Sequence, residues 1–241
     1  MKKLSIQKNN QLITSVDDWK RLAPPEGGDK QWVPLHSAME LANYCIHYLG
    51  NVPKEIDEYL SRIGIKSNDF LSEPECITSL YEDGFGKAGP RHHDLLMWNN
   101  EIVIGVEAKA TETLDEYVTE KCKKNGIVKY SENQLKRYPG LCERLLNKSI
   151  EKCSDIRYQL LSSAAGTLIE ARNRNLNKAC LLVVLFSSEI VPQDHIELTK
   201  KDIENFISCL KKNKNGSYKT TFLPNIDLFV ELIVVDAKTY K

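Results

Sequence analysis

Three things are scarce or missing in this sequence of 241 residues: a net charge, closely spaced cysteines and a long apolar run. Lys+Arg and Asp+Glu number 33 each, which excludes a strongly basic nucleic-acid coat but is compatible with a local basic groove. No segment approaches the roughly 18 apolar residues that a membrane-crossing helix needs, and the N-terminal lysines precede no apolar signal region. We therefore expect a soluble, cytoplasmic protein without a membrane partner.

The seven cysteines are odd in number, scattered and never spaced C-x-x-C. This pattern argues against a disulfide framework and against a zinc knuckle. Several lie inside apolar runs, as Cys180 does in "ACLLVVLF". We expect them to be buried free thiols in a reducing compartment.

Several catalytic signatures are also missing. The chain has neither a G-x-S-x-G elbow nor a G-x-x-x-x-G-K-[ST] loop, and His92 and His93 have no third metal ligand at zinc spacing. The segment "GFGKAG" (84–89) fits G-x-G-x-x-G, but Pro90 and a strand follow it. Because a dinucleotide site needs a helix N-terminus at that point, we interpret the segment as a loop.

What is present is an alternation of helical and strand patterns. Apolar spacing and caps predict helices at about 36–49, 54–63, 113–124, 131–147 and 154–174, and a further helix that starts at a capping box of Thr199 and Asp202. A short strand or turn and a Gly-rich loop are expected between 72 and 93, and apolar runs predict strands at 179–188 and 226–237. The sum is one α/β domain, with an arm and loop over 1–35, a helical part over 36–70 and a core over 75–241 that carries a mixed sheet and a helical insertion at about 110–153.

The clearest hairpin signal is "DLLMW" and "EIVIGVEAK" separated by Asn99 and Asn100. A two-residue turn would pair Asp94 with Gly105 and place Asp94, Glu107 and Lys109 on one face of the sheet. Gly105 would then leave space beside Asp94 for a ligand. The turn also explains why an apolar strand ends in a carboxylate and an ammonium, since both would be held on a rigid support.

Two carboxylates held close together repel each other unless a cation lies between them. Their oxygens suit Mg²⁺ or Mn²⁺, which typically use one or two protein carboxylates and keep waters free for chemistry on a phosphate. A lysine beside them can orient or deprotonate the attacking water, or offset charge that grows on the phosphate. The alternative is that Glu107 and Lys109 belong to a solvated strand end and that Asp94 caps a turn.

At Asp94 and at Glu107-Ala108-Lys109 the sequence resembles the PD-(D/E)XK nuclease superfamily, which has the restriction-endonuclease-like fold with an αβββαβ core. The resemblance implies a metal-dependent nuclease whose expected partner is DNA. It leaves open whether the protein is a homodimer. It implies that Asp94, Glu107 and the carbonyl of Ala108 bind Mg²⁺ or Mn²⁺ and that Lys109 is catalytic. His93 stands where the pattern has proline. A looser resemblance joins "PPEGGDKQW" and "SAMELA" to uncharacterised bacterial proteins grouped with this fold.

Further candidates surround this motif. Many superfamily members carry a glutamate on the helix before the sheet, and Glu40 is the natural match, although it could equally be exposed. Lys87 and Arg91 lie in or beside the Gly-rich loop, and helix residues Gln134, Arg157 and Gln159 could reach a phosphate. For the three helix residues, a surface or packing role is the first expectation.

Two other functions stay open at this point. A catalytically inactive member of the same fold would serve as a nucleic-acid-binding or interaction subunit. A small-molecule or nucleotide sensor would use the Gly-rich loop.

Overall fold

The computed structural model describes residues 1–121, 123–124, 127–128, 131–189 and 191–240. Over these residues the chain forms one nine-stranded mixed sheet in the order β2-β1-β3-β4-β5-β8-β11-β10-β9, and a separate pair β6-β7. The strands of the large sheet are β1 (Lys3–Lys8), β2 (Gln11–Leu12), β3 (Asp69–Thr78), β4 (Arg91–Trp98), β5 (Val103–Lys109), β8 (Lys178–Ser187), β9 (Lys211–Lys212), β10 (Tyr218–Lys219) and β11 (Asp227–Asp236). The expected mixed sheet with helices is confirmed.

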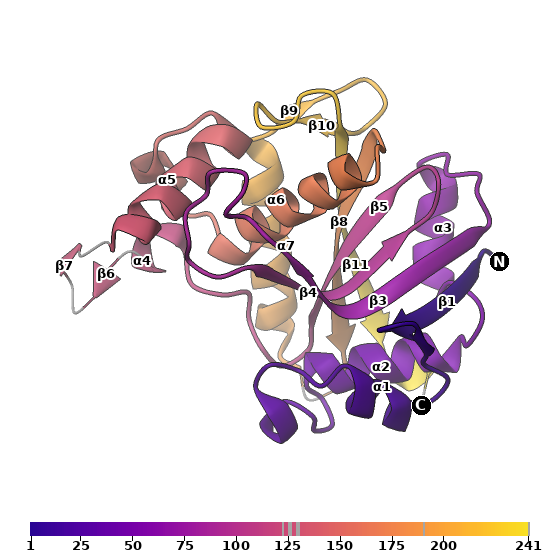
Figure 1. Cartoon of the computed structure of the whole chain (residues 1–241). Helices are drawn as coiled ribbons and strands as arrows, with labels where there is room; N and C mark the ends of the chain where they lie inside the picture. The colour runs from indigo at the N-terminus through magenta and orange to yellow at the C-terminus, as the bar shows by residue number, and fades with distance from the viewer. Residues whose placement is uncertain (122, 125–126, 129–130, 190, 241) are drawn as a thin grey trace.

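Helices cover both faces of this sheet (Figure 1). On one side lie α1 (Val16–Leu22), α2 (Ser37–His47) and α3 (Lys54–Arg62), and on the other α5 (Glu132–Leu146), α6 (Tyr158–Asn173) and α7 (Gln193–Ser208). Each side has its own apolar cluster, with Leu95, Met97 and Val106 facing α2 and Leu96 and Val103 facing α6. Among the described helices, none combines the length and apolarity needed to cross a membrane.

Parallel pairing holds the centre of the sheet together. Strand β8 lies between β5 and β11 and runs parallel to both, with Glu107 opposite Val183 and Lys109 opposite Leu185. Residues 179–186 are all buried, as a strand covered on both faces requires. The helices between β5 and β8 therefore form a crossover connection, and α6 contacts β5, β8, β4 and β3. The small residues of α6, among them Gly166, allow this close approach.

Most predicted elements are confirmed, with three corrections. The expected helix at 113–124 is reduced, in its described part, to α4 (Val118–Lys121), followed by β6 (Lys123–Lys124) and β7 (Ile127–Val128). Thr199 and Asp202 do not cap a helix, because α7 starts six residues earlier and Thr199 Oγ1 donates to the carbonyl of His195 within it. Strand β3 is ten residues long, and β1, which the sequence pattern did not reveal, pairs with it in parallel.

Five of the seven cysteines are buried free thiols as expected, Cys209 is half-buried, and Cys122 lies outside the described residues. Two short connections, η1 (Gly28–Lys30) and η2 (Ile150–Cys153), and a C-terminal turn, η3 (Ala237–Thr239), complete the described elements.

The hairpin between β4 and β5 exists, but its turn is longer than two residues. The pairs Leu95↔Val106 and Trp98↔Val103 leave the four residues 99–102 in the loop, where Asn99 Oδ1 accepts from the backbone N–H groups of Glu101 and Ile102. Gly105 therefore pairs with Leu96, and the expected pairing with Asp94 is wrong. The observed pairing is shifted by two residues from the expected one. Because side chains alternate between the two faces of a strand, a shift of two leaves Glu107 and Lys109 on the α6 face.

The missing side chain of Gly105 serves a different purpose from the one expected. A Cβ atom there would lie 2.1 Å from Thr167 Oγ1 and 3.0 Å from His93 Nδ1. The space is thus filled by α6 and by the fully buried ring of His93, whose Nε2 lies 3.1 Å from Thr78 Oγ1. No room for a ligand remains beside Gly105.

Candidate active site at the fork between two strands

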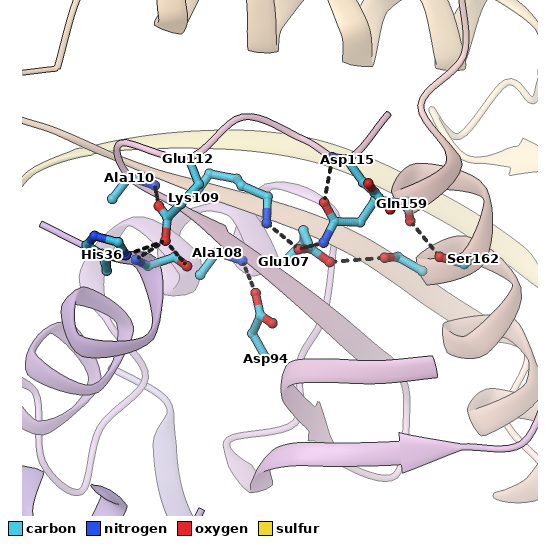
Figure 2. Close-up of polar contacts among 12 residues, drawn as sticks. His36, Asp94, Glu107, Ala108, Lys109, Ala110, Glu112, Asp115, Gln159 and Ser162 are labelled. Atoms are coloured by element: carbon cyan, nitrogen blue, oxygen red, sulfur yellow. Dashed lines mark hydrogen bonds and ion pairs between the residues drawn. The ribbon is translucent and has the colours of Figure 1, made fainter. Parts of the chain in front are cut away.

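Strands β4 and β5 separate at the predicted motif. Their pairing extends only as far as Leu95↔Val106, after which β4 continues along β3 to Arg91 and β5 continues along β8 to Lys109. Asp94 and Glu107 are the first residues beyond the last pair, one on each arm of this fork. The main-chain N–H of Ala108 donates to Asp94 Oδ2 at 2.7 Å across the gap (Figure 2).

Glu107 is completely buried, and four side chains hold its carboxylate. Lys109 Nζ lies 2.7 Å from Oε1, which also accepts from Gln159, and Ser163 Oγ donates to Oε2 at 3.1 Å. Arg91 forms an ion pair with Oε2. Against the effect of burial, Arg91 and Lys109 lower the pKa of Glu107, so this carboxylate stays charged.

Asp94 has the opposite electrostatic environment. Burial and the neighbouring charge of Glu107 raise its pKa to about 6. Lys109 remains an ammonium, because the carboxylates of Glu107 and Asp94 raise its pKa despite burial. The site thus holds one firmly charged carboxylate, one carboxyl that titrates near neutrality, and a lysine that can donate but is poorly suited to act as a base.

A third carboxyl, missed in the sequence, faces Asp94 from β3. Glu75 lies between the pairs Pro74↔Leu95 and Cys76↔His93, opposite Asp94, and has a φ of 48°, a conformation that few residues other than glycine adopt. Around it the strand changes face, since Phe70 packs toward α2 whereas Cys76 packs toward α6. Burial and Asp94 raise the pKa of Glu75 to about 8.

The fork opens into a cleft of about 390 Å³. Its lining brings Asp94 and Lys109 together with two further candidates, Arg91 and Gln159, and with residues that the sequence did not single out: Trp19, Trp32, Ser37, Glu75 and Glu112. Glu26 and Asp115 also line it, so the lining carboxyl groups outnumber the two cations, Arg91 and Lys109.

Ser37, which lines the cleft, is tied to the segment that follows the motif. Glu112 Oε1 accepts from both the backbone N–H and the hydroxyl of Ser37 at 2.9 Å, which caps the start of α2 from another segment (Figure 2). Thr111 Oγ1 donates to the carbonyl of Leu35 at 3.0 Å. The two residues that follow Ala110 thus tie Leu35 and Ser37 to the segment that follows Lys109.

Four predicted site residues lie elsewhere. Glu40 is buried on the α2 side, where its oxygens accept from the Leu35 N–H at 2.9 Å and the Tyr240 hydroxyl at 2.7 Å. The ammonium of Lys87 lies over the ring of Tyr81. Gln134 closes the capping box of α5 with Ser131. Arg157 pairs with Asp202 at 2.7 Å and stacks on Tyr117. None of the four lines the cleft.

In the part of the chain that the structure describes, no group of three or more His, Cys, Asp or Glu side chains has a geometry that could hold a metal ion. A metal at the fork would therefore rest on the two carboxylates of Asp94 and Glu107, with the Ala108 carbonyl as the further ligand that the resemblance suggests.

The comparisons with known proteins give one match. A family model described as a domain of unknown function, DUF6946, matches residues 12–237. No curated protein and no solved structure matches the chain.

Proposed function

This chain belongs to the DUF6946 family, whose function is unknown, and we propose from its own site that it is a metal-dependent nuclease with a PD-(D/E)XK site on a restriction-endonuclease-like core. Its substrate would be a phosphodiester bond, in DNA before RNA, and its setting restriction, repair or phage defence. The observation that supports this most strongly is the fork, which brings Asp94, Glu107 and Lys109 together, with Asp94 and Lys109 lining the cleft and Glu107 buried beneath them.

The donor set fits a divalent cation of the hard type. Asp94 and Glu107 offer carboxylate oxygens from two rigid strands, and Mg²⁺ typically takes one or two protein carboxylates and completes its shell with water and phosphate. The excess of carboxyl groups around the cleft would repel a phosphodiester that arrived without cations. A bound Mg²⁺ or Mn²⁺ would supply Lewis-acid polarisation of the phosphate and a more acidic water.

The chain's own residues have separate roles in this proposal. Lys109 carries a proton and donates hydrogen bonds, so it would orient the attacking water and offset charge that develops on the phosphate, and a role as base is less favoured. Gln159 and Ser163 fix the Glu107 carboxylate in place. Arg91 would release Glu107 to a metal and turn toward the scissile phosphate, which its guanidinium can bind through two hydrogen bonds.

The test is cleavage of supercoiled plasmid and of circular single-stranded DNA in Mn²⁺, Mg²⁺ or EDTA. The metal is used at about 5 mM, a concentration at which weak carboxylate sites bind a divalent cation. Wild-type protein should cut only with metal. Asp94→Asn and Lys109→Met should lose cutting by about 100-fold or more, as expected for residues that act in the transition state. Equal cutting by wild type and both variants would exclude this site.

One observation favours a second candidate, a catalytically inactive nucleic-acid-binding or interaction subunit of the same fold. Both oxygens of Glu107 are already bonded to two side chains each, so this carboxylate is satisfied without a metal. Such a protein would bind nucleic acid without divalent cations and would cut under no metal condition.

A further inference from the structure

The cleft that ends at the fork has one aromatic wall that the motif itself does not require. Trp32 lines this cleft and is half-buried, with part of its indole packed on the apolar cluster beneath α2. Asp94 and Lys109 line the same cleft. A cleft that combines an aromatic ring with a phosphate-handling group suits a nucleotide, with its base on the ring and its phosphate at the motif.

The position of this wall is fixed. Leu35 and Ser37 are both bonded to the segment that directly follows Lys109, Leu35 through its carbonyl to Thr111 and Ser37 to Glu112. Leu35 itself has a φ of 69°, and its N–H is held by the buried carboxylate of Glu40. The segment that carries Trp32 is therefore tied to the segment that follows Lys109, which lowers the entropy lost when a ligand bridges the two.

The size of the cleft limits what can enter. At about 390 Å³ it lies near the lower end of the range for small-molecule pockets, which is roughly 300–1,000 Å³. A base-paired duplex cannot present a single base to Trp32, because its bases are stacked and paired. A single strand, or an unpaired end, exposes the face of each base without that cost.

We propose that this cleft takes one unpaired nucleotide at a time, with the base stacked on Trp32 and its phosphate directed to the fork, so that single-stranded nucleic acid is the preferred substrate class. The proposal rests on the proposed nuclease function for the chemistry, but the binding that it describes does not need cleavage. Because stacking reads only the face of a base, binding should be largely indifferent to sequence.

The experiment measures binding of fluorescein-labelled 12-mer oligothymidylate, and of a 12-base-pair duplex, by anisotropy in Ca²⁺ and in EDTA. Trp32→Phe keeps the aromatic face, Trp32→Leu keeps apolar burial without it, and Tyr81→Ala removes an exposed aromatic side chain outside the cleft. Circular dichroism and thermal unfolding of each variant establish that it is folded.

Wild type should bind the single strand at least tenfold more tightly than the duplex. Trp32→Leu should weaken single-strand binding by about tenfold, within the range measured for loss of a base–aromatic stack, whereas Trp32→Phe and Tyr81→Ala should stay within about twofold of wild type. Equal loss in Trp32→Phe and Trp32→Leu, or equal affinity for duplex and single strand, would overturn the proposal.

The two proposals fail in different ways. If wild type cuts duplex plasmid through Asp94 and Lys109 while Trp32→Leu changes nothing, the nuclease function stands and the single-strand inference is wrong. If Trp32 governs single-strand binding but no metal supports cutting, the inference stands as a binding property and the nuclease function is wrong.

Discussion

The backbone N–H of Ala108 donates a 2.7 Å hydrogen bond to Asp94 Oδ2, across the gap where β4 leaves β5. This one bond joins the two halves of the motif that the sequence separates by thirteen residues. It also explains why the strands diverge without leaving an unpaired donor, since a buried N–H that loses its ladder partner needs another acceptor. The metal-site proposal depends on this local geometry.

The first prediction concerns the burial of Glu107. Glu107→Ala would leave the guanidinium of Arg91 and the ammonium of Lys109 without their shared counter-ion, and both side chains are about 90% buried. We expect a loss of about 3–5 kcal/mol in the free energy of unfolding, measured by urea denaturation. Glu189→Ala, which removes an exposed ion pair with Lys238, is the matched control and should change little. A loss under about 1 kcal/mol in Glu107→Ala would contradict the buried network.

The second prediction concerns pH and Glu75. Its pKa is about 8 in the folded chain against an ordinary value of 4.5, so the folded state favours the protonated form. The stability from this group is present below pH 4.5 and is lost as pH rises through about 8. Glu75→Gln, which stays neutral, should therefore be increasingly more stable than wild type as pH rises from 5 to 9. Parallel stability–pH curves of the two proteins would refute this account of Glu75.

The third prediction compares two helical glycines. A Cβ atom at Gly166 would lie 2.9 Å from His93 Nε2 and 3.0 Å from Arg91 Cγ, whereas one at Gly140 would meet only Phe85 Cδ1 at 3.6 Å. Gly166→Ala should lower the free energy of unfolding by about 1–3 kcal/mol through overpacking. Gly140→Ala should raise it by up to roughly 1 kcal/mol, because alanine favours a helix. Thermal unfolding of both variants decides the sign, and a stabilised Gly166→Ala would show that His93 is not held against α6.

The fourth prediction separates Glu40 from catalysis. Tyr240→Phe removes the hydroxyl that donates to Glu40 Oε2 at 2.7 Å, and leaves a buried carboxylate with fewer partners. The expected loss is about 1–3 kcal/mol of stability. If the proposed nuclease function holds, a folded preparation of Glu40→Gln should cut within a few-fold of wild type at about 20 °C, where a marginally destabilised domain stays folded. A loss of cutting by about 100-fold in a stable Glu40→Gln protein would return Glu40 to the active site.

The sequence predicted much of the fold because the strongest patterns are local. The apolar run at 179–188 and the helical spacing at 36–49 and 131–147 depend on burial of neighbouring residues, and each is matched by β8, α2 and α5. The capping box at Thr199 failed because tertiary contacts recruited both residues, with Asp202 binding Arg157 from another helix. Strand β1 was missed because its partner, β3, lies more than sixty residues away.

The candidate site was predictable in its strand residues and in one helix residue, Gln159. Asp94, Glu107 and Lys109 come together because parity along a hairpin survives a two-residue error in the turn. Glu75, Ser163 and Trp32 reach the same place from other elements, and no spacing in the chain joins them to the motif. A φ of 48° at Glu75 leaves no trace in a sequence read for hydrophobic pattern. Glu40 was expected at the site because many superfamily members carry a glutamate on the helix before the sheet. The sequence itself does not show which way that helix faces.

The central claim, that Asp94 and Glu107 form a divalent-metal site at the fork, is tested most directly by calorimetric titration of Mn²⁺ into wild type and Asp94→Asn. The account predicts one site in the wild type, with an affinity reduced by about tenfold or more in Asp94→Asn while the fold is retained. Absence of a Mn²⁺ site in the wild type at millimolar-scale concentrations, or equal affinity in the two proteins, would contradict it.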